Sequence, residues 1–189
     1  MSGENTVLIS ILEAAGLDSP RRQTALEEEV SALFLQLRSP LLRYLFSIGL
    51  PAQEAEEIAQ EVFLALFRHL RQGKPRTNLK AWVFRAAHNL GLKARGRMQR
   101  AIALDEQQDN HPDPSPSPEE QFAHSQRRQR LRAVVNALPP SDRACVHLRA
   151  AGLKYRDIAS VLGISLGAVA QSLERTLGKL RRLEVSECR

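Results

Sequence analysis

The chain has 189 residues, of which 43% are hydrophobic and 25% are charged, and its formal net charge is +6. This composition can form one or two packed domains and excludes a wholly disordered chain, while two cysteines are too few for a disulfide framework. The longest apolar run, residues 7–12, is far too short to span a bilayer and follows no basic segment, so we expect a cytoplasmic protein without membrane insertion.

Residues 1–25 are expected to be an N-terminal extension, followed by a three-helix module over residues 26–101. The first helix covers about residues 26–50 with one apolar stripe at helical spacing; Gly49 provides its stop, and Pro51 suits the first turn of the second helix. The inward positions of the second helix are Ile58, Val62, Phe63, Leu66, Phe67 and Leu70. Its outward positions, which give it an acidic face, are Glu54, Glu56, Glu57, Gln60 and Glu61.

The loop of residues 72–78 carries turn-forming residues and two positive charges, and Asn78 at its end can cap the third helix. The inward positions of this helix are Leu79, Trp82, Val83, Ala86, Ala87 and Leu90. Its outward positions, which continue into a basic tail, are Lys80, Arg85, His88, Asn89, Lys93, Arg95, Arg97 and Arg100. Because Trp82 lies on the inward stripe, we interpret it as a core residue rather than as a platform for stacking bases.

Residues 102–117 are rich in acidic residues and proline and cannot bury a core, so we expect them to form an extended, flexible linker. A second module follows over residues 118–185, and its first helix ends at Leu138 because two prolines follow. No segment alternates polar and apolar residues for long enough to predict a strand. The predicted fold class is therefore all-α: two small helical modules joined by a flexible, acidic, proline-rich linker, the second module containing a helix-turn-helix.

The end of the second module has the pattern of that helix-turn-helix. Ser141 can cap a helix that ends at Gly152, a short helix covers residues 155–162, and Ser165 can cap a longer helix that reaches about Leu183. The expected shared core is Ile158, Leu162, Ile164, Val169 and Leu173.

The turn between the last two helices meets the requirements of a DNA-binding module. Gly163 can take the left-handed conformation that turns the chain, and Ala159 is small where the helices cross. Residues 127–189 contain thirteen Lys and Arg against five Asp and Glu, a charge that by itself fits a polyanionic partner and solvated helix faces equally. The capped turn, the small residue and this charge together favour DNA binding over an ordinary three-helix bundle. The outward residues expected at a major groove are Ser165, Leu166, Ala168, Gln171, Ser172 and Arg175, with Lys179, Arg181 and Arg182 placed for phosphates.

Several motifs resemble one known family. Residues 55–63 (Ala-Glu-Glu-Ile-Ala-Gln-Glu-Val-Phe) and 82–89 (Trp-Val-Phe-Arg-Ala-Ala-His-Asn) resemble domain two of bacterial sigma factors. Domain four is similar to residues 138–140 (Leu-Pro-Pro), 152–159 (Gly-Leu-Lys-Tyr-Arg-Asp-Ile-Ala) and 162–169 (Leu-Gly-Ile-Ser-Leu-Gly-Ala-Val). The combination resembles most the extracytoplasmic-function (ECF) group, which keeps only these two domains, and it covers residues 27–101 and 127–183.

The resemblance implies a sigma factor that binds core RNA polymerase and directs promoter recognition, melting of the −10 element and transcription initiation. The implied core-polymerase site is the acidic face of the second helix, at Glu57, Gln60 and Glu61. The implied −10 contacts are Lys74, Arg76, Asn78, Arg85, Asn89, Lys93, Arg95 and Arg97. The implied −35 contacts are Ser165, Ala168, Gln171, Ser172, Arg175 and Lys179. Core RNA polymerase and promoter DNA are the implied partners, an anti-sigma protein could hold the two modules together, and no cofactor is expected.

The recognition helix departs from the usual ECF pattern. Where the family commonly has Gly-Thr-Val-Lys-Ser-Arg, residues 167–172 are Gly-Ala-Val-Ala-Gln-Ser, so hydrogen-bond donors are lost at Ala168, Ala170 and Ser172. Lys93 stands where the family usually has aspartate. We therefore expect a weaker or altered −35 preference with a shallower salt dependence, and an altered −10 preference.

Two other functions fit parts of the pattern. A regulator with a LuxR-type helix-turn-helix would bind a palindrome as a dimer without polymerase, and a sigma-like adaptor would act mainly through protein contact. An enzyme is not expected, because the chain has no glycine-rich phosphate loop and no nucleophile–base pairing. Cys145 and His147 are too few for a metal site, so we interpret Cys145 as a buried structural residue.

Overall fold

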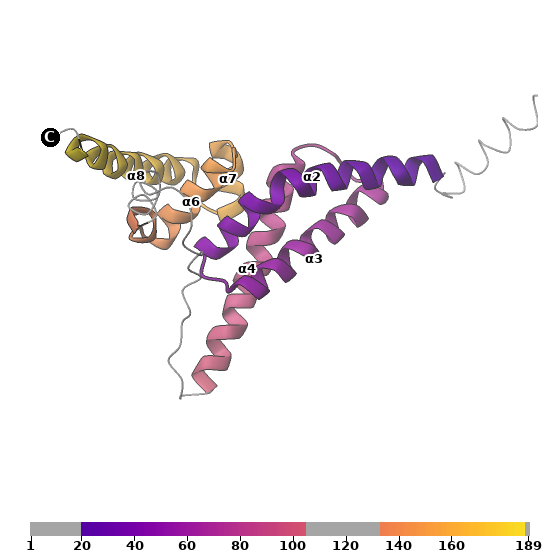
Figure 1. Ribbon diagram of the computed structural model, residues 1–189, viewed down its shortest axis with the longest axis horizontal. Coiled ribbons are helices and arrows are strands. Elements are labelled where there is room, and N and C mark those ends of the chain that lie inside the picture. Colours follow the sequence, from indigo (N-terminus) through magenta and orange to yellow (C-terminus); the bar gives the residue numbers. More distant parts are fainter. Residues whose placement is uncertain (1–19, 105–132, 188–189) are drawn as a thin grey trace, which may run out of the picture.

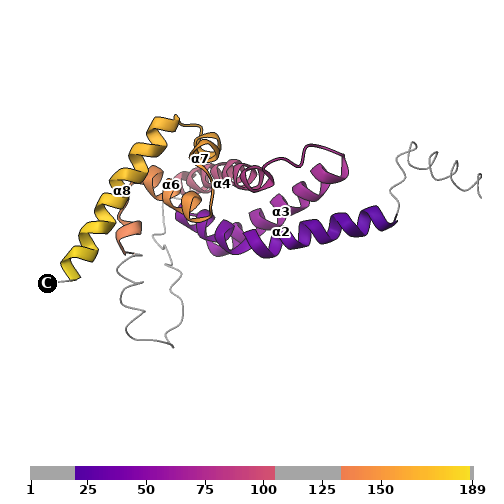
Figure 2. The ribbon, with the colours of Figure 1, turned by 90° about the horizontal axis from the view of Figure 1, so that it is seen from above.

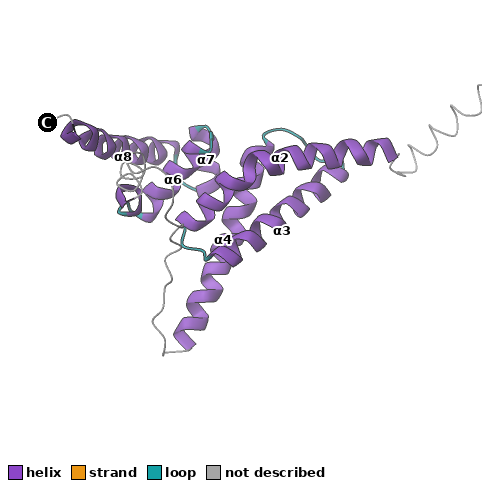
Figure 3. Cartoon of the chain, viewed as in Figure 1, coloured by secondary structure: helices purple, strands orange, loops and turns teal. Residues whose placement is uncertain are grey.

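The computed structural model describes residues 20–104 and 133–187, and the side chains of residues 23–101 and 133–180. Its helices are α2 (Pro20–Ser47), α3 (Ala52–Arg71), α4 (Leu79–Leu104), α6 (Pro140–Ala150), α7 (Tyr155–Leu162) and α8 (Leu166–Glu187). The described ranges contain helices and loops and no strand (Figures 1 and 3), which confirms the all-α prediction. Most of the predicted linker lies outside the described residues.

The first module consists of α2, α3 and α4. A short turn joins α2 to α3, and Gly49 in that turn has a φ angle of +87°, as expected of a helix stop. The rings of Phe34 and Phe63 meet edge to face between the two helices, with centroids 5.0 Å apart. Of the predicted inward residues of α3, Ile58, Val62, Phe63, Leu66 and Leu70 are buried, and Phe67 is partly buried against the core. Ala55 and Ala59 are buried as well.

Gly91 allows α4 to approach the end of α2 closely. A Cβ atom at this position would lie 2.9 Å from Ile48 Cδ1 and 3.2 Å from Leu50 Cδ1, so a larger residue would push the two helices apart. Because α4 packs against α2, α3 and α7, its buried surface is wider than one stripe. The buried surface of α4 therefore includes Phe84, which was not among the predicted inward positions. The prediction that His88 faces outward is wrong, since its side chain is half-buried between α4 and α2.

The second module consists of α6, α7 and α8 and confirms the predicted helix-turn-helix. Gly163 has a φ angle of +66° after α7, and Ser165 Oγ accepts a hydrogen bond from Ala168 N at 3.1 Å, so it caps α8. The prediction that Ser141 is a cap is wrong: α6 begins one residue earlier, and Ser141 lies inside its first turn. The residues buried in or packed against the core here include Ile158, Val161, Leu162, Ile164, Val169 and Leu173.

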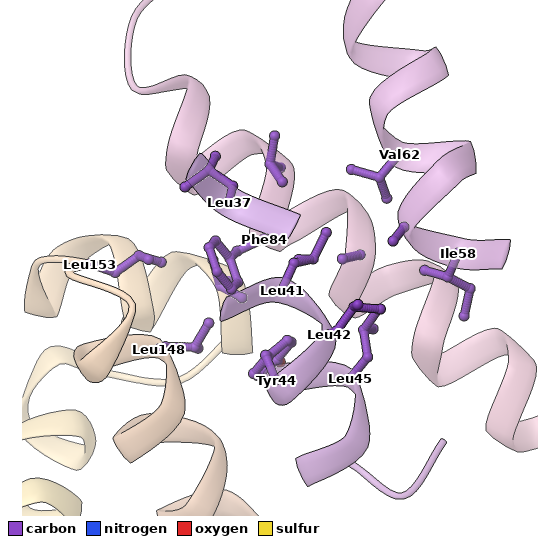
Figure 4. Packing of buried hydrophobic residues seen from close by; sticks show 14 of the residues in the cluster. Leu37, Leu41, Leu42, Tyr44, Leu45, Ile58, Val62, Phe84, Leu148 and Leu153 are labelled. Carbon is purple, nitrogen blue, oxygen red and sulfur yellow. The ribbon is translucent and has the colours of Figure 1, made fainter. Parts of the chain in front are cut away.

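The two modules share one continuous hydrophobic core. α2 packs against α6, and α4 packs against α7. Figure 4 shows where they meet: Tyr44 and Phe84 of the first module face Leu148 and Leu153 of the second. All four side chains are at most 1% exposed. Seen from above in Figure 2, the second module lies at one end of the first. Its helix α8 is on the side of the second module that faces away from α3.

A pair of glycine substitutions tests the turn of the helix-turn-helix. Gly163→Ala is expected to lower the free energy of unfolding by about 1 kcal/mol, because alanine is strained at a positive φ angle although space for its methyl group is open. Gly178→Ala, inside α8, is expected to raise it by up to about 1 kcal/mol, because alanine is the better helix former. Urea unfolding of both variants measures the signs, and a loss of equal size in both would contradict this account.

Candidate nucleic-acid and protein interfaces

The first two turns of α8 carry no charged side chain. The exposed residues there are Ser165, Leu166, Gly167, Ala168 and Gln171, and the side chain of Leu166 is 54% exposed. Of the residues predicted to contact the −35 element, Lys179 is also exposed, but it lies two turns further along the helix. The tip of the helix therefore offers one amide, one hydroxyl and apolar surface to a partner.

The prediction that Ser172 faces outward is wrong. Its side chain is 3% exposed and lies against α6, where its hydroxyl group is close to Asp142 and Cys145. Ser172 falls on the buried stripe of α8, whose members are Val169, Ser172, Leu173 and Thr176. The helical period could have placed it there, because it follows Val169 by three residues.

Arg175 is half-exposed and bound to α6. Its guanidinium Nη2 donates to Asp142 Oδ1 at 2.9 Å, and the Asp142 side chain is 5% exposed. Burial by itself would raise the pKa of Asp142, but the hydrogen bonds from Arg175 and Ser172 and the positive charges of Arg175 and Lys179 together outweigh burial and hold the pKa below its usual value. This ion pair fixes α8 to α6. Local sequence patterns could not predict this ion pair, because its partners are 33 residues apart.

The outer face of α4 carries a row of polar and basic side chains. Arg85, Asn89 and Lys93 follow one another at intervals of four residues, so they lie along one side of the helix, and all three are exposed. Within the described residues none of the three takes part in an ion pair. Side chains spaced in this way can contact successive phosphates of an extended nucleic-acid strand, whereas a single charged side chain contacts only one.

Other predicted −10 residues already have partners in the structure. Arg76 forms an ion pair with Glu29, and Arg97 forms one with Glu54 at 3.1 Å. Asn78 has a φ angle of +56°, and its side-chain amide donates to Asp157 Oδ1 of α7 at 2.7 Å. Lys74 is exposed and Arg95 is partly buried. A contact of Arg76, Asn78 or Arg97 with DNA would require these three residues to give up or share their present contacts.

His69 links the loop of residues 72–78 to α4. Its Nε2 atom donates to the carbonyl oxygen of Pro75 at 3.1 Å, and its ring lies 4.9 Å from the Trp82 ring, tilted by 44°. Trp82 is partly buried and packs against the hydrophobic core, as its place on the inward stripe predicted. His69 therefore fixes the position of the loop relative to α4. The sequence analysis did not identify this residue.

The acidic face of α3 lies beside an apolar groove. Glu57, Gln60 and Glu61 are all exposed. The groove between α2 and α3 has a volume of about 600 Å³, and its lining is formed by Glu27, Val30, Ser31, Phe34, Leu35, Gln60, Phe63, Leu64 and Phe67. Leu35 and Leu64 are 80% and 58% exposed, which is unusual for leucines so close together. The sequence held a signal for this groove, since both leucines lie outside the inward stripes of their helices.

Further properties of the described residues limit the chemistry. They contain no group of three or more His, Cys, Asp and Glu side chains that could hold a metal ion. Cys145 is buried, as predicted, and burial raises the pKa of its thiol. Within residues 20–104 and 133–187, no helix is both long enough and apolar enough to cross a membrane.

Comparison with known proteins identifies the family. The family profile for sigma-70 region 2 matches residues 33–101, and that for sigma-70 region 4 matches residues 128–180. The chain is 33% identical over 135 residues to the ECF RNA polymerase sigma factor ShbA of Streptomyces griseus, covering 68% of this chain and 69% of ShbA. The chain belongs to the ECF group of RNA polymerase sigma factors, the proteins that direct transcription initiation.

One further relative agrees with this assignment, and one solved structure shares the fold. The ECF sigma factor SigE of Mycolicibacterium smegmatis is 36% identical over 132 residues, which cover 68% of this chain but only about half, 51%, of SigE. The structure of the sigma factor RpoE in complex with the anti-sigma factor NepR from Bartonella quintana shares the fold, with a TM-score of 0.62 and 21% identity, over 83% of this chain and 96% of that one.

The ion pair of Arg175 with Asp142 predicts a pH dependence. The pKa of Asp142 lies below the value of 3.8 that we take for the unfolded chain, so its charged form stabilises the fold above that pH, and this stability is lost as the pH falls through the lower folded pKa. Arg175→Gln is expected to cost about 1 kcal/mol at neutral pH and to move acid unfolding to higher pH. Acid titration followed by circular dichroism measures the shift. Arg156→Gln, at an exposed site on α7, is the control, and equal midpoints for both variants would refute the role of the pair.

Proposed function

We propose that this sigma factor binds core RNA polymerase through α3 and reads promoter DNA through α4 and α8. The observation that carries the proposal is the separation of charge between helices of one module. The exposed carboxylates of α3 would repel DNA and suit a basic protein partner, whereas the basic row on α4 suits phosphates. One module therefore offers distinct surfaces to a protein and to a nucleic acid.

The polymerase site consists of the acidic face of α3 and the adjoining groove. A partner helix lying in the groove would bury Leu35 and Leu64 and leave its basic residues beside Glu57 and Glu61. Gln60 belongs to both parts, because it lines the groove and lies on the acidic face. Burial of two exposed leucines supplies affinity, and the carboxylates determine the orientation of the partner.

The −10 site consists of the row on α4 and the loop of residues 72–78. Arg85 and Lys93 would hold the backbone of a separated strand, with Asn89 between them as a donor to bases or sugars. Extruding a base from the duplex costs a few kcal/mol, so the pocket that accepts it must be formed in advance. The contacts of His69 with Pro75 and Trp82 support this role, because they hold the loop in place before DNA arrives.

The −35 site is the exposed tip of α8. Gln171 can read a base edge, and Lys179 can contact a phosphate, but Ala168 contributes neither a charge nor a donor. The −35 contribution to promoter affinity is therefore smaller than that of the −10 site. The same uncharged tip favours a second candidate function, an adaptor that binds polymerase and scarcely reads DNA. An anti-sigma protein, such as the one bound to the related RpoE, is a further proposed partner.

A single experiment tests the proposed function. The purified chain is added to core RNA polymerase on a promoter library, and the transcript starts are sequenced. Sigma activity predicts new starts that share −10 and −35 elements. An adaptor predicts binding to core polymerase without new starts, and a LuxR-type regulator predicts palindrome binding by the protein alone.

The groove predicts a specific loss of polymerase binding. Leu64→Asp is expected to weaken binding of the chain to core polymerase by tenfold or more, since it removes an apolar contact of about 2 kcal/mol and adds a carboxylate to an apolar surface. Leu92→Asp is the matched control, because Leu92 on α4 is 48% exposed and lies outside the groove. Fluorescence titration against core polymerase measures both, and similar affinities for the two variants would exclude the groove from the interface.

The neutral tip of α8 predicts a gain of binding. Ala168→Arg in the assembled holoenzyme is expected to strengthen binding to a −35 duplex and to steepen the plot of log K against log salt by about 0.9, the slope for one added phosphate contact. Titrations at several salt concentrations measure the slope. Arg156→Ala serves to show how much the slope responds to charge outside the recognition helix. A slope that Ala168→Arg leaves unchanged would mean that the tip of α8 does not contact DNA.

A further inference from the structure

The exposed face of α8 changes in character along the helix. The exposed residues of its first two turns are Leu166, Gly167, Ala168 and Gln171. Cations follow only later, at Arg175 in the third turn and Lys179 in the fourth. In a helix-turn-helix, the first turns of the recognition helix meet the base edges in the major groove. The part of α8 that meets bases therefore carries methyl groups and one amide, and no charge.

These side chains restrict the bases that α8 can recognise. Guanine is bound most often by arginine or lysine, which donates to its O6 and N7 atoms. The first such residue in α8 is Arg175, whose guanidinium already donates to Asp142 Oδ1 at 2.9 Å. The exposed carboxylate of Glu174 only accepts hydrogen bonds, so it cannot bind guanine O6 or N7 either. Gln171, in contrast, can form the two hydrogen bonds that the N6 and N7 atoms of adenine require.

Leu166 presents an apolar side chain that the protein does not bury. It is 54% exposed, whereas Val169 and Leu173 in the same helix are at most 4% exposed. Ala168 lies on the other side of the same turn, since two residues advance a helix by about 200°. Both residues can contact the C5 methyl group of a thymine, the apolar group of the major groove. On opposite sides of one turn, they do not make the contiguous apolar patch that marks a protein interface.

Gly167 allows the backbone of this turn to approach the base pairs. A Cβ atom built there would meet only Ser165 Oγ, at 4.0 Å, so the packing of the protein leaves room for a side chain. Glycine inside a helix lowers stability relative to alanine, and the fold does not require it here, whereas a backbone that closely approaches a ligand does. The turn is also fixed in position, because Ser165 Oγ accepts a hydrogen bond from Ala168 N at 3.1 Å.

We infer that the first turns of α8 read A·T base pairs and make no guanine contact. Gln171 binds an adenine, and Leu166 and Ala168 contact thymine methyl groups. The inference rests on the proposed function and deepens it, because it names the class of sequence that the −35 site selects and makes Leu166 a specificity-determining residue. One amide and two methyl contacts discriminate among bases without adding a phosphate contact, so base selectivity is combined with a shallow salt dependence.

Selection of DNA by the holoenzyme tests which bases are read. The full chain with core polymerase binds a pool of randomised duplexes, and the bound DNA is sequenced; the parent is expected to enrich A·T pairs in the −35 region. Each enriched thymine is then replaced by uracil, which lacks the methyl group but keeps every hydrogen-bonding group. Binding is expected to fall about fourfold at the thymine that Leu166 contacts, the equivalent of one buried methyl group. Leu166→Ala is expected to abolish this difference between thymine and uracil.

A change of specificity tests Gln171. Gln171→Arg is expected to change the preferred base at one position from adenine to guanine, by about tenfold, because arginine forms the paired hydrogen bonds to guanine. Lys179→Gln is the matched control. It removes a phosphate contact, so it is expected to weaken binding to all −35 sequences alike and to leave the base preference unchanged.

A more stable variant excludes misfolding as the cause of a loss. Gly167→Ala is expected to raise the thermal midpoint of unfolding and yet to weaken binding of the holoenzyme to the selected −35 duplex, because its methyl group holds the backbone away from the bases. Gly178→Ala, three turns further along α8, is expected to raise the midpoint without this loss. Equal DNA binding by the two glycine variants would overturn the close approach at Gly167.

The outcomes separate this inference from the proposed function. A preference for G·C at the base pairs whose selection Leu166→Ala or Gln171→Arg alters would overturn the A·T reading, even if the holoenzyme initiates transcription. No −35 enrichment, together with weaker binding of Leu166→Ala to core polymerase, would also overturn it and would assign the tip of α8 to a protein contact. Failure to initiate at any promoter would overturn the proposed function, whereas the base preference of α8 is read from binding alone.

Discussion

The arrangement of the helices depends on how Tyr44 is buried. Its side chain is fully buried against Phe84, with the rings edge to face and their centroids 5.8 Å apart, and its hydroxyl group lies 2.7 Å from His88 Nδ1. A buried phenol without a partner would cost several kcal/mol, so α2 and α4 must hold the register in which His88 meets it. Burial lowers the pKa of His88 and raises that of Tyr44, so both are neutral at physiological pH. The partner is within the first module, so this hydrogen bond joins α2 to α4 and does not involve the second module.

The ion pairs determine which cations remain for DNA. Arg76, Arg97 and Arg175 are each bound to a carboxylate of another helix, so part of the basic charge holds the fold together. Among the described residues, Arg85 and Lys93 on α4 have no such ion pair, while the tip of α8 carries no cation. Because exposed pairs contribute at most about 1 kcal/mol, the arginines could still move to a phosphate that offers more. Under the proposed function, the row on α4 would therefore attract DNA more strongly than the tip of α8.

Helical periodicity predicted the helices and the turn at Gly163 because both are local properties of the chain. It also placed the inward residues of α3 correctly, since that helix packs on one side only. It failed for His88 and Ser172, whose environments are formed by helices distant in sequence. α4 packs against three helices, α2, α3 and α7, so a single apolar stripe underestimates its buried face. The contacts between modules, such as that of Asn78 with Asp157, join residues 79 positions apart and leave no trace in local pattern.

The position of α3 keeps its acidic face and the adjoining groove away from the second module. α3 packs mainly against α2 and α4, and the second module lies against α2 and α4 at the other end, so the groove and the acidic face stay open while the start of α4 is covered. The proposed polymerase site is therefore accessible in this arrangement of the helices, whereas Asn78 and Lys80 at the start of α4 are in contact with α7 and with the turn before it. The two proposed sites of the first module thus differ in accessibility because they lie on opposite ends of its helices.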